Sequence, residues 1–185
     1  MASASPRRSE LLRNAGIPFT VQPAHVDETQ RRQELPRDYA QRVACDKARA
    51  VSKQNPSAIV LGADTIVVVG SEILGKPRDA AHAARMLRKL SGRTHQVITG
   101  VALISSGAKE FEDVRAETTK VVFARLSPAE IQDYIAGDEP MDKAGAYGIQ
   151  GRASRWIPKI VGDYFNVVGL PVALVVEMLK KRGLT

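Results

Sequence analysis

A nearly continuous apolar run, AIVLGADTIVVV at residues 58–69, constrains the fold of this chain more than any other stretch. Residues 58–63 carry no charge, and such a short apolar run is typical of a strand that is buried on both faces. Residues 65–69 continue the apolar pattern, and Gly70-Ser71 predicts a hairpin turn directly after it. The fold must therefore place this strand inside a sheet.

The remaining patterns predict helices and strands that do not alternate strictly along the chain. Proline or a capping residue begins most of the helices, and glycine ends several of them. This mixture favours an α/β fold with a mixed sheet and flanking helices over a barrel or a Rossmann sheet. No G-x-G-x-x-G or Walker loop is present. The predicted helices cover about residues 6–15, 36–53, 80–91, 128–136 and 171–182; the predicted strands, besides 58–69, cover about 17–21, 95–105, 110–124 and 156–161; and residues 138–152 are predicted to form a loop.

Composition limits the size, the cellular compartment and the partners that we expect for this chain. Its 185 residues suffice for a substantial core, so we expect a single domain over residues 1–185. The single cysteine, Cys45, excludes an internal disulfide and suits a reducing compartment, which predicts a cytoplasmic protein. No segment is apolar for long enough to cross a bilayer, and no secretion signal is present, so we expect no membrane partner. The formal charge of +7 indicates either an anionic partner, such as a nucleotide, a nucleic acid or phosphate, or a solvated basic surface.

Two charged residues stand at positions where the pattern calls for apolar ones. Lys47 lies on the apolar stripe of the helix predicted over 36–53, four residues after Val43 and four before Val51. Its stem could follow the helix surface and carry the ammonium into water, or the ammonium could have a function. Asp64 ends the buried strand, where it is either a catalytic or metal-binding acid or a turn-forming residue that binds local backbone.

Further charges lie in loops and at a helix start. Glu28 follows a predicted strand, and Lys76 lies in a tight Gly-Lys-Pro loop. Arg7 and Arg8 fall in the first turn of the first helix, where the helix dipole disfavours each cation by about 0.3–1 kcal/mol. Taken singly, each of these charged residues can also be explained as a solvated surface charge. Together they match the needs of phosphoanhydride hydrolysis, which are cations around the phosphoryl oxygens and carboxylates for a divalent metal and for a proton from water.

Four sequence blocks resemble the Maf family of nucleoside triphosphate pyrophosphatases, first named as septum-formation inhibitors. The blocks stand in the family's order and spacing: ASASPRRSELL, GADTIVVV, GKPRDAAHAARMLRKLSGRTHQVITGV and EPMDKAGAYGIQG. The resemblance covers nearly the whole chain. It implies an α/β fold similar to that of the inosine triphosphate pyrophosphatases, with two lobes around a substrate cleft. It also implies hydrolysis of a nucleoside triphosphate to the monophosphate and pyrophosphate with a divalent metal cation, Mg²⁺ or Mn²⁺. The family is implicated in removing non-standard nucleotides and in arresting cell division.

The resemblance also implies roles for individual residues. Asp64 matches the family's proton acceptor, and Glu28 matches an acidic residue implicated in metal binding and catalysis; both carboxylates would lie near the metal, and their roles can be exchanged. No role follows for Asp142 or Lys143. The residues implied to bind substrate are Ser3 and Ser5 in the loop that lines the phosphates, Arg8, Lys47 and Lys76 facing the triphosphate, and Arg7, Thr65 and Gln150 at the positions of substrate choice, where these residue types resemble the subfamily that acts on dTTP and UTP.

The chain departs from the family pattern at its start. Family members have a short apolar strand before the ASxSPRR block, whereas this sequence begins at Met1-Ala2. We therefore expect that strand to be missing or barely present. The departure bears on stability and on the position of the SPRR loop more than on function.

The sequence leaves two other functions open. The same fold can act on a different substrate, such as a modified purine triphosphate. Alternatively, the chain is a non-enzymatic basic module that binds nucleic acid or a division protein, which the charge of +7 and the C-terminal Lys180-Lys181-Arg182 favour. We do not expect a nucleic-acid partner, because no recognised binding motif or aromatic platform is present. The sequence leaves a homodimer open.

Overall fold

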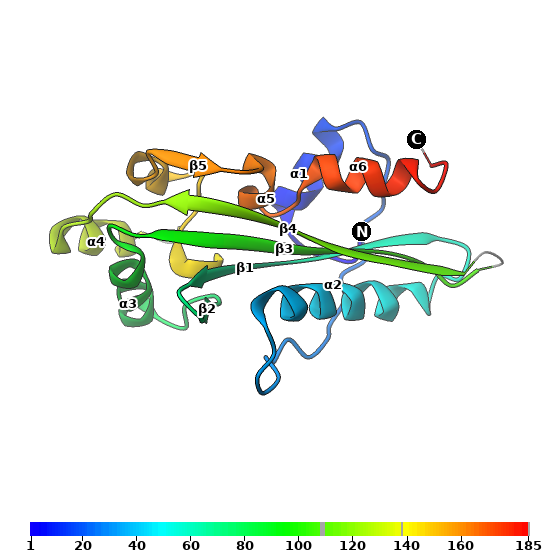
Figure 1. The fold of residues 1–185 in the computed structure, drawn as a ribbon, viewed down its shortest axis with the longest axis horizontal. Helices are drawn as coiled ribbons and strands as arrows, with labels where there is room; N and C mark the ends of the chain where they lie inside the picture. Colours follow the sequence, from blue (N-terminus) through cyan, green and yellow to red (C-terminus); the bar gives the residue numbers. More distant parts are fainter. Residues whose placement is uncertain (108–109, 138, 185) are drawn as a thin grey trace. The chain divides into compact units, whose positions relative to one another are not determined.

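The computed structural model describes residues 1–107, 110–137 and 139–184, and its strands form a five-stranded sheet (Figure 1). In the edge pairs, Val69 of β1 lies opposite Glu72 of β2, and Val122 of β4 lies opposite Lys159 of β5. The α/β class with flanking helices is confirmed, and the sheet is antiparallel where the sequence predicts a mixed one. The sheet order is β2-β1-β3-β4-β5, with β1 at Ile59–Val69, β2 at Glu72–Leu74, β3 at Thr94–Ser105, β4 at Phe111–Val122 and β5 at Lys159–Val161.

The chain divides into two compact units, and β1, β3 and β4 each contribute residues to both. The first unit comprises Met1–Thr65, Thr99–Glu117 and the C-terminal segment from Gly169. The second unit comprises Ile66–Ile98 and Thr118–Val168. Most of the candidate site residues belong to the first unit.

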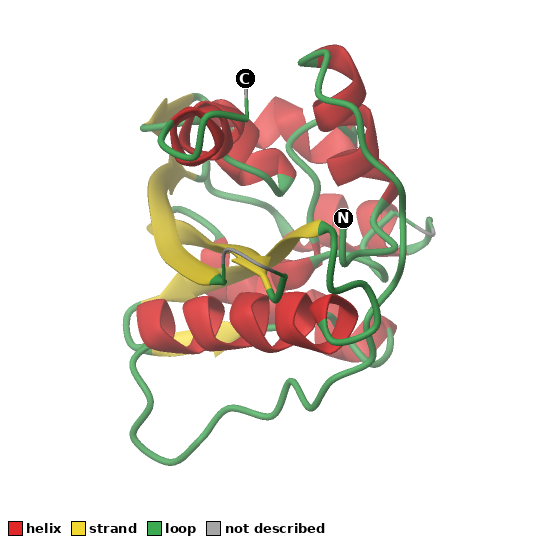
Figure 2. Ribbon diagram, turned by 90° about the vertical axis from the view of Figure 1, so that its right-hand side faces the viewer, coloured by secondary structure: helices red, strands yellow, loops and turns green. Residues whose placement is uncertain are grey.

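In the first unit, helices cover both faces of the sheet. α2 (Pro36–Ser52) lies along one face, while α1 (Pro6–Asn14) and α6 (Val172–Lys180) lie on the other (Figures 1 and 2). Ser5 caps α1 as predicted, because its Oγ accepts the backbone N–H of Arg8 at 3.5 Å. The apolar stripe of α2 is buried, as the sequence predicts, in a core made of Ala2, Ala44, Cys45, Ala48, Val51, Val60, Ala102 and Ile104.

Two glycines allow α2 to approach the sheet closely. A Cβ at Gly62 would overlap the carbonyl oxygen of Ala44, and a Cβ at Gly100 would overlap the carbonyl group of Ala40. Both obstacles are backbone atoms of α2, so no side-chain rotation relieves the overlap. Glycine is therefore required where the helix that carries Lys47 rests on the sheet.

Gly100→Ala is expected to lower the free energy of unfolding by about 1–3 kcal/mol, because the added methyl group overpacks this contact and pushes α2 away. Urea unfolding at neutral pH measures the change. Gly75→Ala is the matched control, since a Cβ there meets no atom within 4 Å. Equal stabilities for the two variants would contradict the close contact at Gly100.

The second unit is built around aromatic side chains. Phe123 and Tyr147 pack edge to face with ring centroids 5.0 Å apart, and Tyr134 packs in the same way on Trp156 at 5.1 Å. Its helices are α3 (Ala80–Leu90), capped by Asp79, α4 (Pro128–Ile135), which begins at the predicted Ser127 capping box, and α5 (Tyr164–Val168). Among the described residues of both units, no helix is long and apolar enough to cross a membrane.

His95 makes the stability of the second unit depend on pH. The ring is 2% exposed and its Nε2 lies 2.7 Å from the Tyr147 hydroxyl; burial lowers its pKa from 6.5 to about 4. Because the unfolded chain binds this proton more tightly, stability rises with pH between these values and falls on acidification. We expect His95→Gln to remove about 3 kcal/mol of the stability loss between pH 7 and pH 4. Urea unfolding at both pH values measures this, and the same loss in variant and wild type would contradict it.

Three segments differ from the sequence predictions. Residues 17–21 form no strand: Pro18 and Pro23 lack backbone N–H donors, and the backbone bonds of this segment reach Met1 through Thr20 and Gln22. Residues 156–161 form a shorter strand, because a 3₁₀ turn extends through Trp156. The predicted loop 138–152 includes a 3₁₀ turn at Ala144–Ala146, and its first residue, Asp138, lies outside the described residues.

The first residues bridge two segments without forming a regular strand. The Ala2 N–H donates to the Leu61 carbonyl at the start of β1, and the Met1 carbonyl accepts the Gln22 N–H. Met1 and Ala2 are both buried. The short extended start therefore holds the SPRR segment against β1.

Candidate active site

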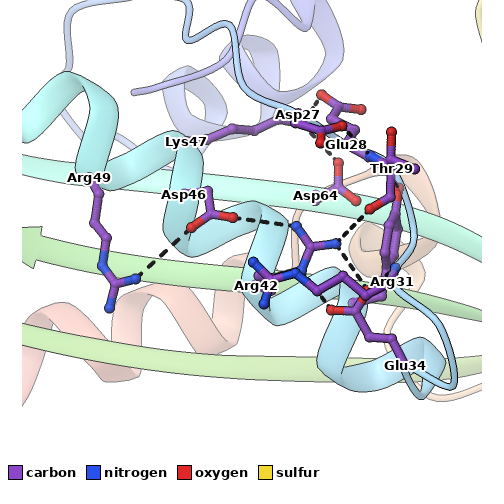
Figure 3. Close-up of polar contacts among 11 residues, drawn as sticks. Asp27, Glu28, Thr29, Arg31, Glu34, Arg42, Asp46, Lys47, Arg49 and Asp64 are labelled. Carbon is purple, nitrogen blue, oxygen red and sulfur yellow. Dashed lines mark hydrogen bonds and ion pairs between the residues drawn. The ribbon is translucent and has the colours of Figure 1, made fainter.

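Lys47 lies between two carboxylates in the first unit. Its Nζ is 2.8 Å from Asp64 Oδ1 and 2.8 Å from Glu28 Oε1 (Figure 3). Lys47 is 9% exposed and Asp64 7%, whereas the Glu28 side chain is 53% exposed. The ammonium therefore stays inside and pairs with both acids, which excludes the interpretation in which the Lys47 stem carries it into water.

Asp64 lies within β1 and not at its end. The strand continues through Asp64 to Val69, which agrees with the range predicted from the apolar pattern but corrects the placement of Asp64 at the end of the buried run. Beyond Asp64, the strand pairs with β2 in the same sheet through Val67, Val68 and Val69. Asp64 is therefore held by strand backbone, which fixes its position more rigidly than a turn would.

Arg8 is buried beside the first group, among neutral oxygens. Its Nε donates to the Gly169 carbonyl at 2.8 Å, and its Nη1 donates to the Ala63 carbonyl at 2.8 Å. Two side chains accept the rest of the contacts: Ser3 Oγ at 3.1 Å from Nη1 and Thr65 Oγ1 at 2.9 Å from Nη2. These bonds satisfy N–H groups without neutralising the charge, and burial lowers the pKa of Arg8.

The structure gathers several of the residues predicted from the sequence into two groups. One is Glu28, Lys47 and Asp64, and the other is Ser3, Arg8 and Thr65. They meet on β1, because Arg8 binds the backbone and side chain of the residues on either side of Asp64. Of the other predicted residues, Ser5 caps α1, Arg7 is half-buried on the same helix turn, and Lys76 and Gln150 are exposed residues of the second unit.

The residues that hold the segment around Glu28 were not among those predicted from the sequence. Tyr39 donates its hydroxyl to the Glu28 carbonyl at 2.7 Å, and Arg42 donates to the Thr29 carbonyl at 3.0 Å. The only local signal is the spacing of Arg42 four residues before Asp46 on α2, which fits an ion pair on one helix face. A contact with a loop more than ten residues away has no such signature.

The same group offers oxygen ligands to a hard cation. Glu28 and Asp64 supply two carboxylates, and hard divalent cations such as Mg²⁺ are bound by one or two carboxylates with substrate phosphates and water. Within the described part of the chain, no cluster of three or more His, Cys, Asp or Glu side chains is arranged to hold a metal by itself.

Comparison with known proteins identifies the family of this chain. The family model described as Maf-like protein matches residues 1–182. The chain belongs to the Maf family. This Maf chain is 58% identical to a dTTP/UTP pyrophosphatase of Koribacter versatilis over 99% of this chain and 93% of that protein, and 57% identical to a dTTP/UTP pyrophosphatase of Symbiobacterium thermophilum with the same coverage.

Further similarity extends to a third relative and to one solved structure. A dTTP/UTP pyrophosphatase of Moorella thermoacetica is 52% identical over 99% of this chain and 94% of that protein. A nucleoside-triphosphatase / dITP/XTP pyrophosphatase of Mycobacterium abscessus aligns over 97% of this chain and 94% of that chain, with a TM-score of 0.44 and 18% identity.

Proposed function

We propose that this Maf family member hydrolyses dTTP and UTP to the monophosphate and pyrophosphate. The observation that carries the proposal is the pair of carboxylates, Glu28 and Asp64, that Lys47 holds at 2.8 Å in a chain 58% identical to a dTTP/UTP pyrophosphatase. Two acids and a cation at one point are the groups that phosphoanhydride hydrolysis uses. The free, buried Cys45 suits a reducing compartment, and we propose that the protein works in the cytoplasm.

In the proposed reaction, Asp64 takes a proton from the water that attacks the α-phosphorus. Its place on β1 keeps the carboxylate fixed, and Lys47 orients it through Oδ1. The P–O bond to the β-phosphate breaks, and pyrophosphate leaves with the electron pair. Lys47 then contributes positive charge to the departing phosphates. Glu28 and Asp64 can exchange the role of base, because both carboxylates bind the same ammonium.

A divalent cation, Mg²⁺ or Mn²⁺, fits the residues present. The two carboxylates are hard oxygen donors, and the Glu28 side chain is exposed enough to meet a hydrated ion. Glu28 and Asp64 would hold it. When bound, such a cation lowers the pKa of water and neutralises phosphate charge.

The remaining predicted residues would bind the nucleotide. Arg8 carries a buried positive charge beside Asp64, which favours an anion near the start of α1. We propose that Ser3, Ser5 and Lys76 also contact the phosphates. Arg7, Thr65 and Gln150 would contact the nucleoside and set the preference for dTTP and UTP. The Thr65 hydroxyl lies 2.9 Å from both Arg8 Nη2 and the Thr99 hydroxyl, which fixes its orientation.

A nucleotide panel with product analysis tests the proposal. The protein is incubated with Mg²⁺ and dTTP, UTP, dATP or a modified purine triphosphate, and monophosphate, diphosphate, pyrophosphate and phosphate are separated. We expect pyrophosphate and monophosphate from dTTP and UTP at rates well above those with dATP. Faster turnover of the modified purine triphosphate would show that this nucleotide is the preferred substrate in place of dTTP and UTP. No pyrophosphate from any triphosphate would overturn the enzyme assignment.

A further inference from the structure

We propose that Arg42 is a positioning residue that sets the place of Glu28 in the proposed reaction. This inference rests on the proposed function. The guanidinium of Arg42 connects α2, which carries Lys47, to the irregular segment of residues 27–34, which carries Glu28 (Figure 3). Arg42 has no assigned role in the chemistry itself.

Arg42 binds the segment at two points. Its Nη2 donates to the Thr29 carbonyl at 3.0 Å, one residue after Glu28. Its Nε and Nη2 also grip Glu34 at 2.6 and 3.0 Å in a two-pronged ion pair, and a Glu34 oxygen accepts the Arg31 N–H at 3.0 Å. One planar group therefore ties down both ends of the turn that follows Glu28.

Two further hydrogen bonds, which do not involve Arg42, fix the peptide group between Glu28 and Thr29. The Glu28 carbonyl accepts the Tyr39 hydroxyl at 2.7 Å, and the Thr29 N–H donates to Asp27 Oδ1 at 2.8 Å. Burial and the charges of Asp64 and Glu28 raise the pKa of Tyr39 to about 12, so the phenol stays a donor. With Arg42 on the next carbonyl, successive backbone groups around Glu28 are held from α2.

Packing does not hold this segment. A hollow of about 560 Å³ lies between it and α2, lined by Val26, Asp27, Thr29, Gln30, Arg31, Arg42 and Asp46. Residues 27–33 are all exposed, and Leu35, directly after the segment, is 65% exposed. The position of Glu28 therefore depends on polar bonds across the hollow.

The Arg42–Glu34 pair is well suited to this task. The Arg42 side chain is 14% exposed and that of Glu34 10%, so water screens the pair less than an open surface pair. The bond to Glu34 raises the pKa of Arg42, and the bond to Arg42 lowers the pKa of Glu34, so both stay charged around neutral pH. Asp46 adds a longer contact to Nη1 at 3.4 Å.

Arg42→Lys tests the inference, because lysine keeps the charge but lacks the planar fork that binds Glu34 and Thr29 together. Arg49→Lys is the matched control: Arg49 lies on the same helix and grips Glu112 with the same fork at 2.7 and 2.6 Å, away from Glu28. Steady-state pyrophosphate release from dTTP gives kcat and KM. We expect Arg42→Lys to lower kcat roughly 10- to 100-fold with KM nearly unchanged, and Arg49→Lys to stay within twofold of wild type.

Two further readouts separate positioning from loss of fold. In a Glu28→Gln background, Arg42→Lys should have no added effect on kcat, because it acts through Glu28. Amide hydrogen exchange of residues 27–34, which needs no activity, should be faster in Arg42→Lys than in Arg49→Lys.

The outcomes distinguish this inference from the proposed function. An active wild type in which Arg42→Lys behaves like Arg49→Lys, or in which its effect is as large in the Glu28→Gln background, overturns the positioning role alone. Unchanged exchange at residues 27–34 also overturns it, whatever the activity. A wild-type protein that releases no pyrophosphate overturns the proposed function, and the role of Arg42 in the reaction falls with it.

Discussion

Asp64→Asn is expected to lower kcat by about 10²–10⁴-fold, the range that a general base contributes, while KM changes little. The amide keeps the shape of the carboxylate and its place on β1, and Lys47 keeps its pairing with Glu28. The variant should therefore fold and bind nucleotide but fail to take the proton from water. Pyrophosphate release and equilibrium nucleotide binding, measured side by side, check both halves.

Glu112→Gln is the control for this change. It removes another carboxylate of the same unit, one that pairs with Arg49 and lies outside the Lys47 group. Its activity should match the wild type. A nearly normal rate in Asp64→Asn would remove Asp64 from the role of base; if Glu28→Gln were then inactive, the two carboxylates would have exchanged roles.

Lys47→Met is expected to lower the free energy of unfolding by about 3 kcal/mol, because it leaves the buried Asp64 without its cation. Glu28 can turn toward water, since half of its side chain is already exposed, but Asp64 on β1 cannot. The double variant Lys47→Met/Asp64→Asn should regain most of this loss, because it removes the buried charge together with its partner. Urea unfolding of the three proteins measures the effect.

Additive losses would contradict this account of Lys47. If the double variant were less stable than Lys47→Met by the full cost of Asp64→Asn alone, the two residues would not be coupled. Lys47→Arg serves as a control, because it keeps a cation on the same helix turn. It should be more stable than Lys47→Met, and equal stabilities would point to lost packing of the stem in place of lost charge.

Local patterns predicted the elements that carry the candidate site. The apolar stripe of α2 and the apolar run around Asp64 are short-range signals. The first indicates that Lys47 is a charged residue at a buried position, and the second indicates the same for Asp64. Caps at Ser5 and Ser127 placed two helix starts correctly for the same reason. That Lys47 would contact Asp64 does not follow from either pattern, because the contact depends on how α2 lies on the sheet.

Other parts of the fold could not be predicted, for identifiable reasons. The alternation of Ile17, Phe19 and Val21 resembles a strand, but Pro18 inside this segment and Pro23 after it lack backbone N–H donors. The backbone bonds to Met1 come from Thr20 and Gln22. The five-residue helix α5 is too short to show a helical period. Arg42 reaches a loop that has no periodicity, so its contacts with Glu34 and Thr29 have no sequence signal.

Hydrolysis of dTTP in ¹⁸O-labelled water tests the proposed reaction most directly. In the proposed reaction, water attacks the α-phosphorus, so the label should appear in the monophosphate while pyrophosphate stays unlabelled. Mass spectrometry of the two products reads the result from a single incubation with Mg²⁺. Label in the pyrophosphate, or release of phosphate and diphosphate instead, would contradict the proposed chemistry.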